Sequence, residues 1–130
     1  MSWVEIFAVF VVSHLVGDYL LQTDWQARHK RGGLQGDPVA RRALFAHVTT
    51  YTLAFVPALV WLADDLGAGI AWVAALIAIP HLIQDDGRLL TWFVYRVKGC
   101  DDETAPEVFK MVDQTFHAIA LFGLAVAAGS

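Results

Sequence analysis

The feature that most constrains the fold of this chain is a set of four long apolar segments that contain almost no lysine or arginine. They cover approximately residues 3–21, 44–63, 70–86 and 107–128. Each is close to the ~17–25 residues that a helix needs to cross ~30 Å of hydrocarbon. The chain of 130 residues is also 57% hydrophobic, above the roughly 45–50% of soluble domains. The sequence therefore predicts one all-α integral-membrane domain over residues 1–130, built as a bundle of four transmembrane helices.

Local signals give details of these helices. The runs SWVE at residues 2–5 and TAPE at residues 104–107 match the capping box that satisfies free amides at a helix start. Pro57 and Pro80 lie inside the second and third segments, where we expect kinks rather than helix ends. The run LADDLGAG at residues 62–69 predicts a tight connection between those two segments.

A basic and aromatic stretch, RLLTWFVYRVKG, follows the third segment. Its leucines, aromatic rings and cations are typical of a helix lying in the membrane interface, which predicts such a helix over residues 88–98. A plain extension of the third helix beyond the bilayer is the alternative.

The basic residues predict the orientation. They follow the first and third segments or lie at the start of the fourth: Arg28, Lys30, Arg31, Arg41, Arg42, Arg88, Arg96, Lys98 and Lys110. The opposite side carries Glu5, Asp64 and Asp65 and no basic residue. By the positive-inside rule the basic side is cytoplasmic and both termini face outward.

Composition also excludes some functions. The net charge is −4 and the sequence has no basic stripe, which argues against nucleic acid as a partner. Cys100 is the only cysteine, so no internal disulfide can form. We also expect no cleaved signal peptide, because no basic region precedes the first apolar run.

Histidine and aspartate recur four residues apart inside the apolar segments. His14 and Asp18 form the first such pair, HLIQD supplies His81 and Asp85, and DQTFH supplies Asp113 and His117. Residues at this spacing lie one above the other on a helix, with Cβ atoms about 5–6 Å apart. The second segment adds His47 and Tyr51 in HVTTY, and all of these residues lie toward the predicted cytoplasmic side.

Ionisable residues inside a membrane helix are costly to insert and mark functional sites. Imidazoles and carboxylates suit divalent transition metals, and helical bundles build one- and two-metal sites from such residues. The sequence predicts a site for one or two ions, zinc foremost and Fe or Mn as alternatives. The predicted ligands are His14, Asp18, His47, His81, Asp85, Asp113 and His117. A metal-free polar network and a path for protons or ions are the competing interpretations.

Some of these residues and their neighbours can be given expected catalytic or supporting roles in such a site. We take Asp18, Asp85 and His47 as the catalytic candidates, with Asp18 or Asp85 as general base. Tyr51 and Gln114 are expected to support the ligands. Gly17 predicts a close helix contact. Five other polar residues are expected to be solvated: His29, Asp86, Asp101, Asp102 and Glu103.

The runs SHLVGDYLLQTDW, HLIQD and DQTFH resemble the small bacterial integral-membrane family named domain of unknown function 3307. The likeness covers approximately residues 11–121 and implies a bacterial inner-membrane protein. The H-x-x-x-D pattern is also similar to inner-membrane metal-dependent hydrolases. It is more distantly similar to the alkaline ceramidases, which use several histidines and an aspartate within the bilayer.

Three functions remain open at this point. The first is a metal-dependent hydrolase that acts on a lipid or another membrane-partitioned substrate at the cytoplasmic leaflet. The second is a metal or ion carrier, or a channel subunit. The third is a non-enzymatic structural protein with a buried polar network. Membrane lipids are the expected partners in each case, and a homo-oligomer is possible.

Overall fold

The computed structural model describes residues 1–129, and those residues form helices and turns without a strand. Two of the helices continue directly into π-helical turns, here named η1 and η3, and a 3-10 turn is named η2. In chain order the elements are α1 (Trp3–Leu15), η1 (Val16–Leu21), α2 (Asp24–His29), α3 (Pro38–Ala54), α4 (Val56–Leu66), η2 (Gly67–Gly69), α5 (Ile70–Asp86), α6 (Arg88–Phe93), η3 (Val94–Lys98) and α7 (Pro106–Ala128).

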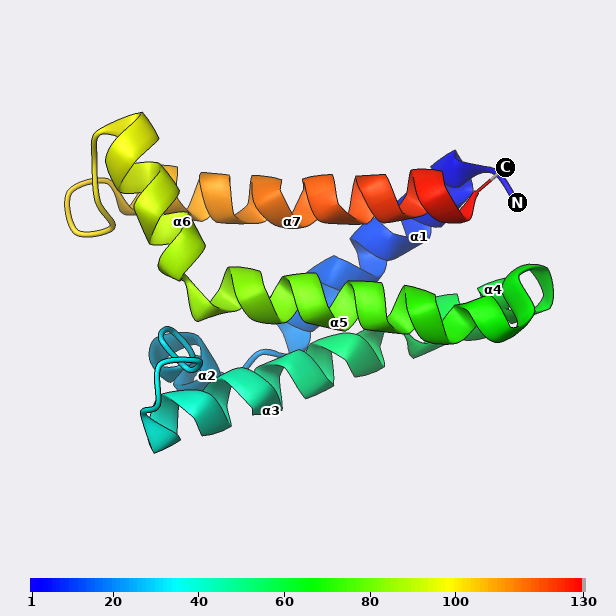
Figure 1. Ribbon diagram of the computed structural model, residues 1–130, viewed down its shortest axis with the longest axis horizontal. Coiled ribbons are helices and arrows are strands. Elements are labelled where there is room, and N and C mark those ends of the chain that lie inside the picture. Colours follow the sequence, from blue (N-terminus) through cyan, green and yellow to red (C-terminus); the bar gives the residue numbers. More distant parts are fainter. Residues whose placement is uncertain (130) are drawn as a thin grey trace.

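The long helices run between two ends of the molecule (Figure 1). Both termini lie at one end, whereas α2, α6 and the loops beside them lie at the other. Helix α7 packs against α1 and α5, and α3 packs against α5 and η1. The chain reverses at η2, so that α5 returns along both α4 and α3.

Three stretches within residues 1–129 are long and apolar enough to cross a membrane: Trp3–Leu21, Val56–Asp86 and Pro106–Ala128. The first and last match the predicted segments 3–21 and 107–128. The middle stretch has 31 residues and contains the reversal at η2, so the predicted segment 70–86 is its second arm, α5.

The predicted single helix over residues 44–63 is wrong in its bounds. The chain instead forms α3 and α4, separated at Phe55, which adopts φ −86° and ψ −7°. Pro57 is the physical reason, because its ring clashes with the carbonyl of the residue four places earlier and it lacks an N–H. At the other end the helix begins earlier than predicted, since Asp37 caps it and Pro38 takes the first helical position.

The two predicted capping boxes have different outcomes. Ser2 and Glu5 form one, with the Ser2 backbone N–H donating to the Glu5 carboxylate at 3.0 Å. The second prediction is wrong: α7 starts after Ala105, without a side-chain cap. Thr104 is occupied elsewhere, because its N–H and hydroxyl both donate to Asp101 at 2.8 Å. These bonds hold the pKa of the Asp101 carboxyl below its usual value.

The segment predicted over residues 88–98 has those bounds in α6 and η3. It is not an extension of α5, because Gly87 takes a left-handed conformation with φ 82° and redirects the chain. Leu90 and Val94 turn one face of the segment inward against Phe109.

An apolar core fills the end of the bundle near the termini. It brings together residues of α1, α3, α4, α5 and α7: Ile6, Phe10, Tyr51, Phe55, Ala58, Leu62, Val73, Ile77, Leu121, Leu124 and Ala125. A smaller cluster of Leu90, Val94 and Phe109 lies at the opposite end. The predicted polar residues occupy the helices between these two apolar regions.

Gly17 makes the close helix contact that the sequence predicted. A Cβ added there would lie 2.6 Å from Cδ2 of Tyr51 and 3.3 Å from its Cα. We expect Gly17→Ala to lower the free energy of unfolding by about 1–3 kcal/mol, the usual cost of overpacking. Gly123→Ala is the matched control, because a Cβ at Gly123 meets nothing within 4 Å. Denaturant unfolding in detergent measures both, and equal stability of the two variants would contradict this packing.

Candidate metal centre

The seven predicted ligands come from four parts of the fold and meet in one region. His14 lies in α1 and Asp18 in η1, His47 in α3, His81 and Asp85 in α5, and Asp113 and His117 in α7. Most are buried, with exposed fractions of 0% for His47, 1% for His117 and 2% for His81. The Asp113 side chain is more open, at 24%.

Four of these residues, here called the tetrad, converge most tightly: Asp18, His47, His81 and Asp85. Nε2 of His47 lies 3.0 Å from Nε2 of His81. The same two nitrogens lie 2.8 and 3.1 Å from Oδ2 of Asp85. Their distances to Oδ1 of Asp18 are 3.2 and 3.5 Å.

These spacings fit a tetrahedral ion. Ligand atoms at about 2.0–2.1 Å from a metal lie about 3.3–3.4 Å from one another in a regular tetrahedron. The five distances between tetrad atoms span 2.8–3.5 Å, on both sides of that value. Oδ1 of Asp18 has no hydrogen-bond partner in residues 1–129 although it is buried, which is the condition of an atom that faces a cation.

A second group, here called the triad, consists of Asp85, Asp113 and His117. Nδ1 of His117 lies 2.7 Å from the backbone carbonyl of Asp113, which can only accept, so this nitrogen carries the proton. In the neutral ring Nε2 is then a bare lone pair, and it points at Oδ1 of Asp85 from 3.3 Å. Two acceptors facing each other need a proton or a cation between them.

Asp85 belongs to both groups. Its Oδ2 faces the tetrad histidines, whereas its Oδ1 faces His117. A carboxylate placed in this way is suited to hold two cations at once, one on each oxygen.

His14, Tyr51 and Gln114 lie beside the tetrad and fix its surroundings. The ring nitrogens of His14 lie 3.1 Å from the Tyr51 hydroxyl and 2.9 Å from Oε1 of Gln114. The Tyr51 ring stacks on His81 with centroids 3.4 Å apart. Because protein groups engage both His14 nitrogens, this histidine lies outside the two groups that can hold an ion within residues 1–129.

Lys30 is the site residue that sequence reasoning missed. Its ammonium donates to Oδ2 of Asp85 at 2.7 Å and to Oε1 of Gln22 at 2.6 Å. The sequence places Lys30 in a hydrophilic stretch after the first apolar segment, where a lysine ordinarily sets topology. Nothing local in the sequence indicates that it reaches α5.

Hydrogen bonds to Asp86 hold the loop after α2, and Lys30 with it, close to the end of α5. Its backbone carbonyl accepts the N–H of Gly32 and its carboxylate accepts the N–H of Leu34, each at 2.8 Å. The expectation that Asp86 is solvated is therefore wrong: it is 2% exposed and ties the loop after α2 to the end of α5. His29, Asp101, Asp102 and Glu103 are exposed as predicted.

Two cavities give access to the centre from the end that carries the loops. The larger, here called the cation-lined cavity, has a volume of about 310 Å³ and is lined by Asp18, Tyr19, Lys30, Arg31, Lys110 and Asp113 among others. A smaller cavity of about 70 Å³ shares Lys30, Arg31 and Asp113 with it and reaches Asp85. The centre is therefore buried within the bundle but connected to the surface.

The contact between Lys30 and Asp85 can be tested by unfolding. We expect Lys30→Met to lower the free energy of unfolding by about 1.5–3 kcal/mol, the range for hydrogen bonds to charged groups. Arg28→Met is the control, because it breaks an ion pair between Arg28 and Asp24 on the surface. Their side chains are 73% and 77% exposed, respectively. Such pairs contribute less than about 1 kcal/mol. Equal losses in denaturant unfolding would show that Lys30 is not part of the centre.

Comparison with known proteins identifies the family. The family model described as "Protein of unknown function (DUF3307)" matches residues 6–129. Neither a curated protein nor a solved structure matches the chain. The match includes all seven predicted ligands as well as Lys30 and Gln114. The chain therefore belongs to the DUF3307 family.

Proposed function

We propose that this protein is a metal-dependent hydrolase of the bacterial inner membrane that acts on a lipid or another membrane-partitioned substrate at the cytoplasmic leaflet. The observation that carries the proposal is the convergence of two imidazole nitrogens and two carboxylate oxygens within 2.8–3.5 Å of one another. A protein interior tolerates such a group only if a cation or protons hold it together.

In this proposal the chain crosses the membrane four times. The crossings are α1 with η1, α3 with α4, α5, and α7. The position of both termini at one end supports an even number of crossings (Figure 1). The basic residues belong to the other end, which by the positive-inside rule is cytoplasmic. Segment 88–98 would then lie along the cytoplasmic interface.

The donor set favours zinc, with Fe²⁺ and Mn²⁺ as alternatives. The tetrad would hold one ion with all four protein ligands. The triad would hold a second ion with three protein ligands, of which Asp113 lines the cation-lined cavity. Closed four-ligand sites are typically structural and three-ligand sites catalytic, so the triad is the reactive half of the centre in this proposal.

A metal at such a site supplies a Lewis acid and activates water near neutral pH. The protein's own groups do the rest. Asp18 and Asp85 are engaged with the tetrad histidines, so we assign the role of general base to Asp113, which lines the cation-lined cavity and would hold the second ion through one carboxylate oxygen while the other oxygen accepts the proton of water. The proton that Asp113 takes from water would be passed by the same carboxyl to the leaving group, and His117 lies next to it, with Nδ1 3.7 Å from Oδ1 of Asp113.

A structural metal site is the second candidate, and one observation favours it. The four tetrad side chains are 0–7% exposed, as expected for an ion that stabilises the fold rather than reacts. The opening of Asp113 to the cavity is what separates the hydrolase from this alternative.

Metal content tests the tetrad directly. We expect the protein purified in mild detergent without chelators to carry one or two transition-metal ions per chain, measured by elemental analysis. His47→Ala and His81→Ala should each remove at least one of them. His29→Ala is the matched control, because His29 is exposed in α2, and it should retain the full content. A wild-type protein without stoichiometric metal would end the proposal.

The proposal that the tetrad holds an ion while Asp113 acts as the general base can be tested with Asp113→Asn. This change keeps the shape of the side chain and leaves the tetrad untouched, so at least one ion per chain should remain bound. Hydrolysis of ester, amide and phosphate-ester amphiphiles should fall at least 100-fold, the lower range for a lost general base. Wild-type rates with Asp113→Asn would contradict the assigned role, and absence of any metal-dependent wild-type activity would favour the structural alternative.

A further inference from the structure

Two hollows on the face formed by α1 and α7 meet at one residue. The first is the cation-lined cavity beside the metal centre. The second is an apolar groove of about 420 Å³ lined by Phe7, Gln114, Thr115, Ala118, Ile119 and Phe122. Gln114 lines both, and its side chain also contacts His14 and Asp113. The polar cavity and the apolar groove are therefore neighbours on either side of Gln114.

The cavity is lined by three basic residues, Lys30, Arg31 and Lys110, as well as by the carboxylates of Asp18 and Asp113. Lys110 extends over the Tyr19 ring at 5.7 Å and has no ion-pair partner within residues 1–129. Arg31 packs over Phe109 at 4.3 Å and pairs with Asp102. A free ammonium at the mouth of a cavity that leads to a cation site favours an anionic occupant.

The groove, unlike the cavity with its charged lining, is lined mostly by apolar side chains. Phe7 and Phe122 meet edge to face with ring centroids 5.6 Å apart, and Ile119 is 61% exposed. In the proposed membrane this face is in contact with hydrocarbon, so a groove here suits an alkyl chain. A site suited to a charged headgroup and a site suited to an alkyl chain thus lie next to each other.

We propose that the cavity and the groove together bind one anionic lipid. Its phosphate or carboxylate headgroup lies beside Lys110, its acyl chain lies along α1 and α7, and its scissile bond faces Asp113. This substrate assignment rests on the proposed hydrolase function.

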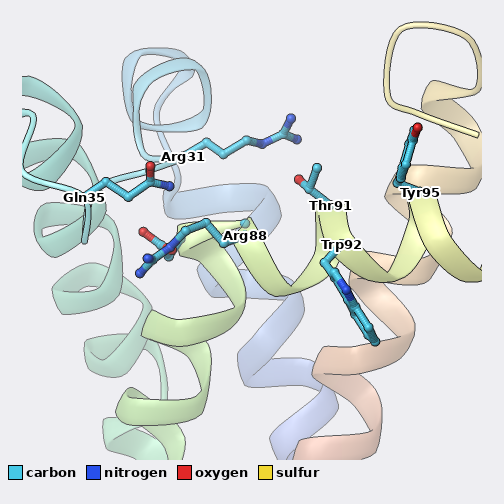
Figure 2. A pocket seen from close by; sticks show the side chains of 9 residues that line it. Arg31, Gln35, Arg88, Thr91, Trp92 and Tyr95 are labelled. Carbon is cyan, nitrogen blue, oxygen red and sulfur yellow. The ribbon is translucent and has the colours of Figure 1, made fainter.

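A larger hollow elsewhere fits such a ligand less well. It has a volume of about 580 Å³ and lies between the loop after α2 and α6 (Figure 2). The side chains of Arg31 and Arg88 point in different directions there, and Arg88 is paired with Asp86. None of the seven predicted ligands lines it. It offers neither a free cation aimed inward nor access to the metal centre.

Lipid binding tests the inference separately from catalysis. The probes are phosphatidic acid, phosphatidylcholine and glycerol 3-phosphate, titrated into the full-length protein in a nonionic detergent and followed by native mass spectrometry. We expect phosphatidic acid to bind more tightly than phosphatidylcholine, and glycerol 3-phosphate, which lacks a chain, to compete poorly. Lys110→Gln should weaken phosphatidic acid binding about fivefold, as for one cation near an anionic headgroup. Ala118→Trp should block the groove and weaken it at least as much.

Two matched variants control for charge and bulk. Lys98→Gln removes a lysine from η3, away from both hollows, and Ala71→Trp adds the same bulk on the exposed face of α5. Both should bind phosphatidic acid as the wild type does. Equal effects of target and control variants, or equal binding of the three probes, would overturn the inference. Metal content measured on the same samples distinguishes failure of the lipid site from failure of the proposed hydrolase function. If the protein retains metal but shows no preference for phosphatidic acid, only the lipid site is refuted. If it prefers phosphatidic acid but carries no metal, only the hydrolase function is refuted.

Discussion

The arrangement of this protein depends on the burial of Asp85 among partners from other segments. Its two oxygens lie within 3.3 Å of groups on Lys30, His47, His81 and His117. An isolated charged carboxylate is so costly to bury that it would become protonated, or the helix that carries it would not pack in the bundle. With cationic and metal-binding groups around it, the same carboxylate becomes the point at which α3, α5, α7 and the loop after α2 must meet.

The sequence predicts much of this because the main signals are local. Apolar length gives the long helices, and the spacing of histidine and aspartate puts each pair on one helix face. Since a buried face must turn inward, the pairs were expected to converge, and they do. The parts that could not be predicted are non-local. Lys30 reaches Asp85 across 55 positions of sequence, and Asp86 is buried only because the backbone of residues 32–34 lies against it.

Two further differences are departures from a regular helix: the sequence predicts a kink at Pro57 where the helix in fact ends, and the π-helical turn has no signal in the hydrophobic pattern. The break at Phe55 separates α3 from α4 two residues before Pro57. Tyr51 therefore lies near the end of α3, where its ring stacks on the ring of His81. The π-helical turn over Val16–Leu21 carries Asp18, and Gly17 within it allows the close approach of Tyr51. Such turns are frequent at functional sites. The π-helical turn thus carries a tetrad residue, whereas the break at Phe55 lies in the apolar core, one helical turn beyond Tyr51.

The distribution of polar groups also bears on the choice between an enzyme and a carrier. A carrier or channel needs polar groups along the whole path that the ion takes. Here two cavities that reach the polar centre are lined by Lys30 and Arg31, at the end of the bundle that carries the loops. The end near the termini is closed by side chains such as Phe10, Phe55 and Leu62, each at most 1% exposed. A site reached from one end of the bundle, with an apolar core at the other end of residues 1–129, therefore favours the proposed reaction over the passage of an ion through one chain.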